Sequence, residues 1–216
     1  LDPNRADWRV EVAYAQNNLG TLMFEQGRPP HALTAFRNAL AVFDAERVRA
    51  PKDKARIVDT ADSRAWIADS LLKLGRVSEA RVERETSAKL LAQAAADNPG
   101  DKRLAARSVA TGLALARLEL DLGRVASARA RSDDGMRKLR ELAALDPTNA
   151  RWREYLLVGQ LDTVDLACWS GDLDGARKAH AAAAADLAKL RAEQGGKGWR
   201  IDLDGRMDLQ AVVLAL

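Results

Sequence analysis

Histidine and cysteine are the side chains best suited to catalysis or to binding a transition metal, and this chain has only His31, His180 and Cys168. A histidine-based metal site or catalytic triad would need both histidines, which lie in two distant segments. Cys168 could act as a nucleophile only as a thiolate, and no histidine or charged residue stands at a helical spacing that would activate it. We therefore expect no enzymatic activity and a structural role for Cys168.

The sequence Asp-Leu-Asp-Gly occurs twice, beginning at Asp172 and at Asp202. Closely spaced aspartates suggest calcium, but the calcium-binding loop needs further ligands at fixed spacing and a terminal glutamate. Neither copy has them, and the first coincides with a turn between two predicted helices. We interpret it as a helix cap, and the sequence predicts no metal site and no cofactor.

Nucleic acid is a minor alternative partner, because the formal net charge is +3 and residues 124–142 are rich in arginine. Phosphate binding needs clustered cations. However, Asp133, Asp134 and Glu141 lie among those arginines, and no aromatic side chain stands nearby to stack on bases. A solvated outer helix face is the simpler interpretation.

Three residue types recur at one spacing, which indicates internal repeats. Proline, glycine and alanine each return every 48 residues without insertion: Pro3, Pro51, Pro99 and Pro147; Gly27, Gly75, Gly123 and Gly171; Ala32, Ala80, Ala128 and Ala176. A fixed period of this order is typical of stacked-repeat proteins. We expect one repeat domain over residues 1–216, with repeats at 2–49, 50–97, 98–145 and 146–193 and a half-repeat at 197–216.

Each repeat is expected to contain two helices. Between a proline and the next repeated glycine, the apolar residues follow a helical spacing, and glycine at that position allows the left-handed turn that ends a helix. Pro29 and Pro30 then suit the first turn of a second helix. Columns of small and large side chains, such as Gly20 and Phe43, recur so that helix pairs can stack and bury their apolar faces. The sequence therefore predicts an all-α fold, an α-solenoid of antiparallel helix pairs.

Leu19-Gly20, Gly27, Ala32, Phe36 and Ala39 have the internal spacing of the tetratricopeptide (TPR) motif. The chain thus resembles TPR-like arrays whose units are longer than the usual 34 or so residues. Arrays of this kind occur in bacterial multidomain signalling proteins, where they follow a serine/threonine kinase domain. The resemblance implies a right-handed superhelix and a non-catalytic, protein-binding scaffold. A ligand- or peptide-sensing module of a bacterial kinase, which would lie outside the cytoplasm if a membrane span precedes it, is the alternative.

In TPR arrays the first helix of each repeat lines the concave, partner-binding face. The family's groove-facing positions map here onto two rows of mixed charge. The first row is Asn17, Asp69, Arg117 and Asp165, and the second is Glu25, Lys73, Asp121 and Trp169. Repeats two to four depart from the motif at the Phe36 position, with Arg84, Ser132 and His180. The resemblance therefore supports a peptide or protein partner without naming it, and we expect charge reversal at Arg117 or Asp165 to weaken binding without changing the melting temperature.

The segment that follows Gly195 and Gly196 is predicted to form the first helix of a further repeat, with Trp199 at the position equivalent to Trp8. No second helix follows to cover Val213, Leu214 and Leu216, so we expect self-association through residues 199–216 and a longer natural chain. No apolar run reaches the about eighteen residues that a membrane-spanning helix needs. The single cysteine favours a reducing compartment such as the cytoplasm, whereas a preceding kinase and membrane span would favour the periplasm.

Overall fold

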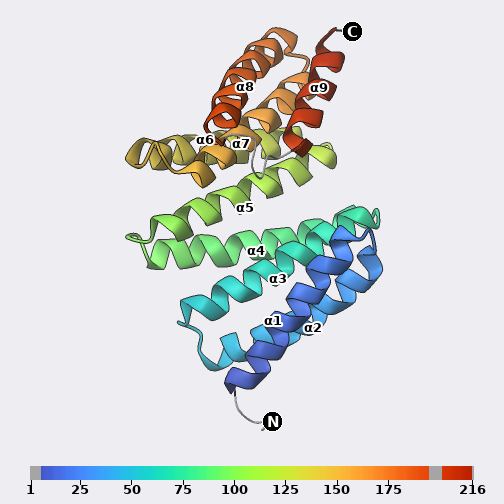
Figure 1. Cartoon of the computed structure of the whole chain (residues 1–216), viewed down its shortest axis with the longest axis vertical. Helices are drawn as coiled ribbons and strands as arrows, with labels where there is room; N and C mark the ends of the chain where they lie inside the picture. Colours follow the sequence, from blue (N-terminus) through green and yellow to red (C-terminus); the bar gives the residue numbers. More distant parts are fainter. Residues whose placement is uncertain (1–5, 195–200, 216) are drawn as a thin grey trace. The chain divides into compact units, whose positions relative to one another are not determined.

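The structure is a computed structural model that describes residues 6–194 and 201–215. In these residues it is all-α, and no strand occurs among them, which confirms the predicted fold class. The helices are α1 (Ala6–Glu25), α2 (Pro29–Arg49), α3 (Lys54–Lys73), α4 (Val77–Asp97), α5 (Lys102–Asp121), α6 (Val125–Leu145), α7 (Ala150–Trp169), α8 (Leu173–Gln194) and α9 (Ile201–Ala215) (Figure 1).

Two series of helices advance along the chain at the predicted spacing. Helices α1, α3, α5 and α7 begin at residues 6, 54, 102 and 150, and helices α2, α4, α6 and α8 begin at residues 29, 77, 125 and 173. Both series therefore step by 48 residues. We name the first series helices A and the second series helices B.

Local sequence explains where the helices end and begin. The four repeated glycines have φ between 71° and 75°, a left-handed conformation that side-chain-bearing residues rarely adopt. At the first of them, Gly27 N–H donates to the carbonyl of Phe24 and Arg28 N–H donates to that of Met23, which closes α1. At the start of α3, the carboxylate of Asp53 accepts hydrogen bonds from the N–H groups of Ala55 and Arg56.

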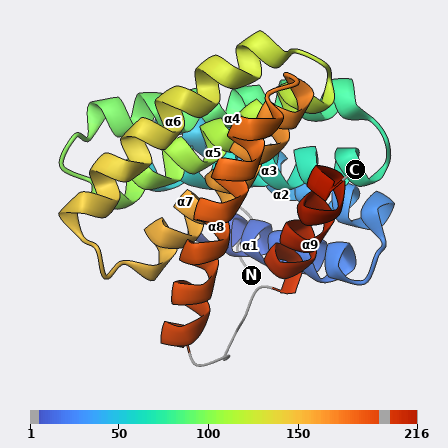
Figure 2. The same cartoon turned by 90° about the horizontal axis from the view of Figure 1, so that it is seen from above.

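The described residues fall into two compact units, unit 1 (Leu1–Thr111) and unit 2 (Gly112–Leu216), and the boundary lies within α5. In unit 1, α1 packs on α2, α2 on α3 and α3 on α4. In unit 2, α6 packs on α7, and α7 and α8 both contact α9 (Figures 1 and 2). The short turns between α1 and α2 and between α3 and α4 make each pair antiparallel, as expected of stacked helix pairs.

Aromatic rings occupy the core of unit 1. The ring of Phe36 is fully buried and stacks on Trp66, with centroids 5.4 Å apart and planes 11° from parallel, and Phe24 meets the edge of Trp66. A Cβ atom on Gly20 would lie only 2.6 Å from the Phe36 ring. Gly20 is therefore the residue that lets α1 approach the ring of Phe36 closely.

Unit 2 has an aliphatic core that includes α9. Leu203 and Met207 of α9 pack with Leu157, Leu161 and their neighbours on α7 and α8. Leu214 packs against the cluster of Val164, Ala167 and Ala176. The predicted fifth helix A is thus present over 201–215 and covers α7 and α8, while Trp199 and Leu216 lie outside the described residues.

The small-residue columns of the sequence lie where helices meet. Ala32, Ala80, Ala128 and Ala176 are all at most 2% exposed. Ala128 packs against Leu120 and Leu166. We therefore predict that Ala128→Leu overpacks this contact and lowers the free energy of unfolding by about 1 to 3 kcal/mol in urea unfolding. Arg124→Leu, in the exposed turn before α6, is the control, and equal midpoints for both variants would contradict the close contact.

None of the helices within residues 6–194 and 201–215 has the length and apolar character needed to cross a bilayer.

Candidate functional site

In unit 1, the predicted groove residues split into two kinds. The Asn17 amide exchanges hydrogen bonds of 3.1 and 3.2 Å with the Ser63 hydroxyl on α3, and Asp69 pairs with Arg84 on α4. Glu25 and Lys73 are exposed and are the last residues of α1 and α3. Asn17 and Asp69 therefore hold helices together, whereas Glu25 and Lys73 reach solvent.

Asn17 does not belong to the row in which the sequence analysis places it. Asp69, Arg117 and Asp165 are 48 residues apart, whereas Asn17 precedes Asp69 by 52. The position of α1 equivalent to Asp69 is Thr21, one helical turn further along. The one-turn error arose because Asn17 and Thr21 lie on the same face of the helix, so polarity alone could not separate them.

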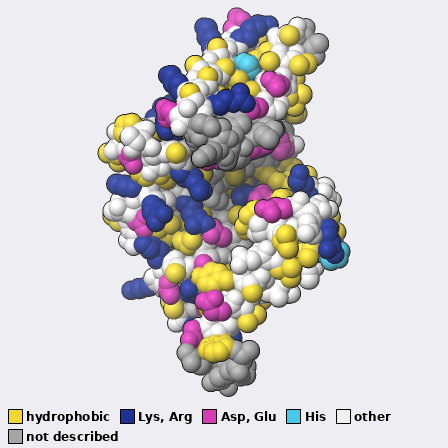
Figure 3. Space-filling model, in the orientation of Figure 1, with side chains coloured by type: hydrophobic (Ala, Val, Ile, Leu, Met, Phe, Trp, Pro, Cys, Tyr) yellow, Lys and Arg dark blue, Asp and Glu magenta, His cyan; other side chains and the backbone are white. Residues whose placement is uncertain are grey.

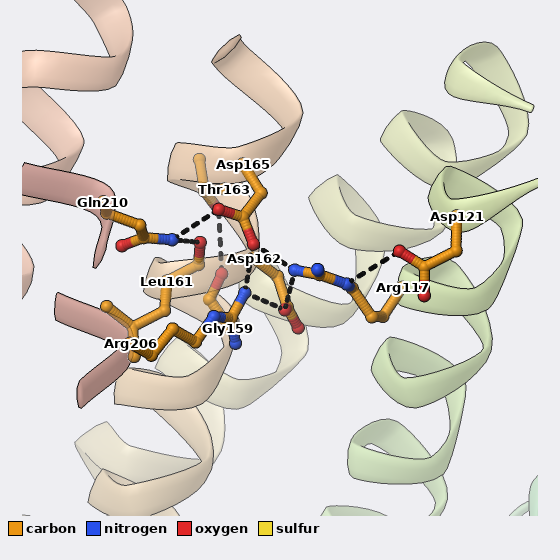
Figure 4. A network of polar contacts seen from close by, with 9 residues as sticks. All are labelled: Arg117, Asp121, Gly159, Leu161, Asp162, Thr163, Asp165, Arg206 and Gln210. Atoms are coloured by element: carbon orange, nitrogen blue, oxygen red, sulfur yellow. Dashed lines mark hydrogen bonds and ion pairs between the residues drawn. The ribbon is translucent and has the colours of Figure 1, made fainter. Parts of the chain in front are cut away.

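In unit 2, Arg117 and Asp165 belong to a polar network that joins α5, α7 and α9 (Figure 4). Arg117 pairs directly with Asp165, and its Nε donates to Asp121 Oδ1 over 3.2 Å. From α9, Arg206 Nη2 lies 2.6 Å from Asp162 Oδ1 and 2.6 Å from Asp165 Oδ2. Two arginines therefore share two carboxylates that project from one face of α7.

Gln210 completes this network from the same face of α9 as Arg206. Its amide nitrogen donates to Asp165 Oδ1 over 2.6 Å and to the carbonyl of Leu161 over 2.8 Å. Gln210 is itself 5% exposed. Because a buried amide is costly unless it is hydrogen-bonded, these contacts fix the register of α9 against α7.

The pKa values of the two carboxylates of the network are shifted in opposite directions. Burial raises the pKa of Asp162 above its ordinary value, against the lowering effect of Arg206 and Arg117. Burial acts on Asp165 as well, but hydrogen bonds from Gln210 and Arg206 outweigh it and hold the pKa of Asp165 below its ordinary value. The environment therefore stabilises the ionised form of Asp165 and destabilises the ionised form of Asp162.

The space beside this network is too small for a ligand. A gap of about 10 Å³ is lined by Arg117, Asp162 and mainly apolar neighbours, which is room for about one water molecule. The carboxylates and guanidinium groups already satisfy one another. The network is therefore best described as a structural clamp on α9, and charge reversal at Arg117 or Asp165 should change stability, contrary to the expectation from sequence.

Among the predicted groove residues of unit 2, Asp121 and Trp169 are exposed. They are the last residues of α5 and α7. Trp169 is 62% exposed, and the neighbouring Leu173 is 47% exposed. Exposed tryptophans are enriched at the centres of protein interfaces, so this end of α7 is a candidate for partner contact in unit 2.

The residues considered for chemistry have structural contacts. Burial, with a further contribution from Asp165, raises the pKa of the Cys168 thiol and disfavours the thiolate. His180 Nε2 lies 3.1 Å from the carbonyl oxygen of Met207. Asp172 accepts a hydrogen bond of 2.9 Å from Gly175 N–H and so caps α8, as predicted, whereas the second Asp-Leu-Asp-Gly lies within α9. Across the described ranges, no group of three or more acidic, histidine or cysteine side chains could hold a metal ion.

Sequence reasoning missed Asp162, Arg206 and Gln210. Asp162 and Asp165 are three residues apart and so share one face of α7, which was a signal for a charged cluster. Their partners were not identifiable, because α9 departs from the 48-residue spacing: Trp199 stands 47 residues after Trp152.

Comparison with known proteins gives similarity at the level of solved structures. The chain matches no protein-family model and no curated protein sequence. A thermophilic TPR protein of Thermus thermophilus is 19% identical, with a TM-score of 0.44, covering 93% of this chain and 99% of that one. A Podospora anserina chain, described as a kinesin light chain with nearly identical TPR-like repeats, is 15% identical, with a TM-score of 0.36, covering 83% and 96%. Both are helical-repeat proteins. At these values the likeness carries no argument about function.

Proposed function

We propose that the chain is a non-catalytic interaction module that binds a peptide or protein partner through the exposed ends of its helices A. Glu25, Lys73, Asp121 and Trp169 carry the proposal, because each is the last residue of a helix A and each is exposed. Other equivalent positions of the repeats, such as that of Ala32, hold a small buried residue in every repeat. A constant scaffold with varied exposed positions is typical of binding solenoids.

Charge on the surface also favours a protein partner over nucleic acid. Basic, acidic and hydrophobic side chains are interspersed on the face shown in Figure 3. On the arginine-rich α6, Asp134 pairs with both Arg137 and Lys138, and Glu141 pairs with Arg137. These cations are partly neutralised by neighbours on their own helix, which weakens the case for phosphate binding.

Substitution at the exposed positions tests this function once a partner is captured with the intact chain. Trp169→Ala and Lys73→Glu should each weaken the complex about tenfold or more, which is about 1.4 kcal/mol or more of binding free energy. Neither should change the melting temperature, because both side chains are exposed. The affinity of each variant can be measured by calorimetric titration.

Arg137→Glu on helix B is the matched control, and we expect it to bind like the wild type. Loss of binding in this control alone would move the site to the helix B face. Unchanged binding in both helix A variants would contradict the proposed function.

A further inference from the structure

Helix α1 carries an exposed apolar stripe. Trp8, Val12, Ala15, Leu19 and Leu22 are separated by alternating steps of four and three residues, the spacing by which one helix packs along another. Trp8 is 40% exposed, Val12 59%, Leu19 42% and Leu22 48%, and Ala15 is also exposed. These residues form a single row along one side of the helix, which we call the α1 stripe.

The same positions one repeat later form an internal interface. Thr60, Ser63, Ile67 and Ser70 of α3 stand 48 residues after Val12, Ala15, Leu19 and Leu22, and all four are at most 1% exposed. They are buried because α1 and α2 pack on α3. The face of α3 that is equivalent to the α1 stripe therefore packs against other helices. The α1 stripe has more apolar side chains than that face of α3.

A hollow adjoins the α1 stripe on the side of α2. It has a volume of about 420 Å³, and its walls come from α1, including Leu19 and Met23, and from α2, including His31 and Thr34. A hollow of this size beside a row of exposed apolar side chains can accept large side chains from a second helix.

We propose that two copies of this chain form a dimer in which their α1 stripes pack antiparallel about a two-fold axis at Ala15. The order of side-chain sizes along the stripe suits this pairing. Ala15 meets Ala15 of the second copy at the axis, where small residues let the helices approach. On either side Val12 meets Leu19, and Trp8 meets Leu22. Each large side chain of one copy thus faces an apolar side chain of the other, as an isologous interface requires.

The estimated interface area and the positions of the acidic residues agree with a second copy of the chain as the partner of the α1 stripe. Helices of about 20 residues are about 30 Å long, and a face two helices wide spans about 20 Å. Each copy could therefore bury about 600 Å², or about 1,200 Å² in total, the lower end of the range for specific interfaces. With the axis at Ala15, the acidic residues Asp7, Glu11 and Glu25 do not lie opposite one another, so the pairing brings no carboxylates into direct repulsion.

Sedimentation equilibrium of the 216-residue chain tests the dimer. The wild type should be dimeric at micromolar concentration, and Val12→Asp should weaken the dimer at least 100-fold. Val82→Asp is the matched control, because Val82 is also a valine of unit 1, is 56% exposed and lies on α4, which packs on α3; it should leave the dimer intact. Circular dichroism of both variants should match the wild type, since both valines are exposed.

The α9 surface can be distinguished in the same experiment. Its exposed apolar residues are Leu209, Val212 and Val213, a shorter row than the α1 stripe because Leu214 packs inward. Val213→Asp should leave the dimer intact. Dissociation by Val213→Asp and not by Val12→Asp would overturn the α1 dimer in favour of self-association through residues 199–216. A wild type that stays monomeric would also overturn it and leave the stripe to a helix from another protein.

Cross-linking tests the antiparallel geometry. In a Cys168→Ser background, Ala15→Cys places two thiols at the axis, and mild oxidation should join the copies by a disulfide. Glu25→Cys is the control, because in an antiparallel pair the two copies of residue 25 are about 30 Å apart. Efficient cross-linking of Glu25→Cys, or none of Ala15→Cys, would overturn the proposed arrangement.

Discussion

Replacing Arg206 with leucine should lower the free energy of unfolding by about 3 kcal/mol at pH 7, because it leaves a buried carboxylate without its closest counterion. Arg206 lies 2.6 Å from both Asp162 and Asp165, and the side chain of Asp162 is only 11% exposed. Arg117 remains as a counterion for Asp162, but at the longer distance of 3.7 Å. Chemical denaturation followed by circular dichroism measures the effect.

The pH dependence of this loss has a definite sign. The pKa of Asp165 is lowered in the folded chain, so its contribution to stability is present above the ordinary aspartate pKa and is lost as the pH falls through the lowered value. The pKa of Asp162 is raised, so its contribution is greatest in acid and is lost as the pH rises through the raised value. Arg206 lowers the pKa of both carboxylates, so its removal should cost most at neutral pH, where both are ionised, and less in acid as Asp162 and then Asp165 become protonated.

Asp162→Asn provides the control for that interpretation. This substitution removes the buried charge while preserving shape, so Arg206→Leu should cost clearly less in the Asp162→Asn background than in the wild type. An equal cost in both backgrounds would show that Arg206 stabilises α9 by packing of its aliphatic stem and not by pairing with Asp162.

The helix pairs of the four repeats could be predicted from sequence, because the same pattern of glycines and small residues occurs in each repeat. Gly27, Gly75, Gly123 and Gly171 all have positive φ, and the small columns are all buried. A pattern repeated four times averages out local irregularities, so the positions of helices A and B followed from periodicity alone. Caps such as Asp53 and Asp172 were equally local, because a cap bonds to N–H groups two or three residues away.

Contacts between helices of different repeats could be predicted only where they obey the period. Arg117 and Asp165 are 48 residues apart, and their opposite charges on equivalent positions could have indicated that they bind each other. The resemblance to TPR arrays instead predicts that both residues contact a partner, because it places them on a groove-facing column. Arg206 and Gln210 break the period, since α9 is shifted by one residue relative to the repeat, and only the structure could place them on α7.

Gly20→Ala should destabilise unit 1 by about 2 kcal/mol, although alanine normally favours a helix over glycine by about 1 kcal/mol. The new methyl group would stand 2.6 to 2.8 Å from three atoms of the Phe36 ring, which is fully buried and stacked on Trp66, so the ring cannot give way without disturbing that stack. Gly205→Ala in α9 is the matched control, because a Cβ atom there has nothing within 4 Å and should stabilise the chain slightly. Phe36→Leu should make room for the methyl group, so that Gly20→Ala costs less in the Phe36→Leu background. If Gly20→Ala proved as stable as Gly205→Ala in thermal and urea unfolding, close packing of α1 on Phe36 would not be the reason for glycine at this position, and the match to the small-residue position of the TPR motif would lose its physical basis.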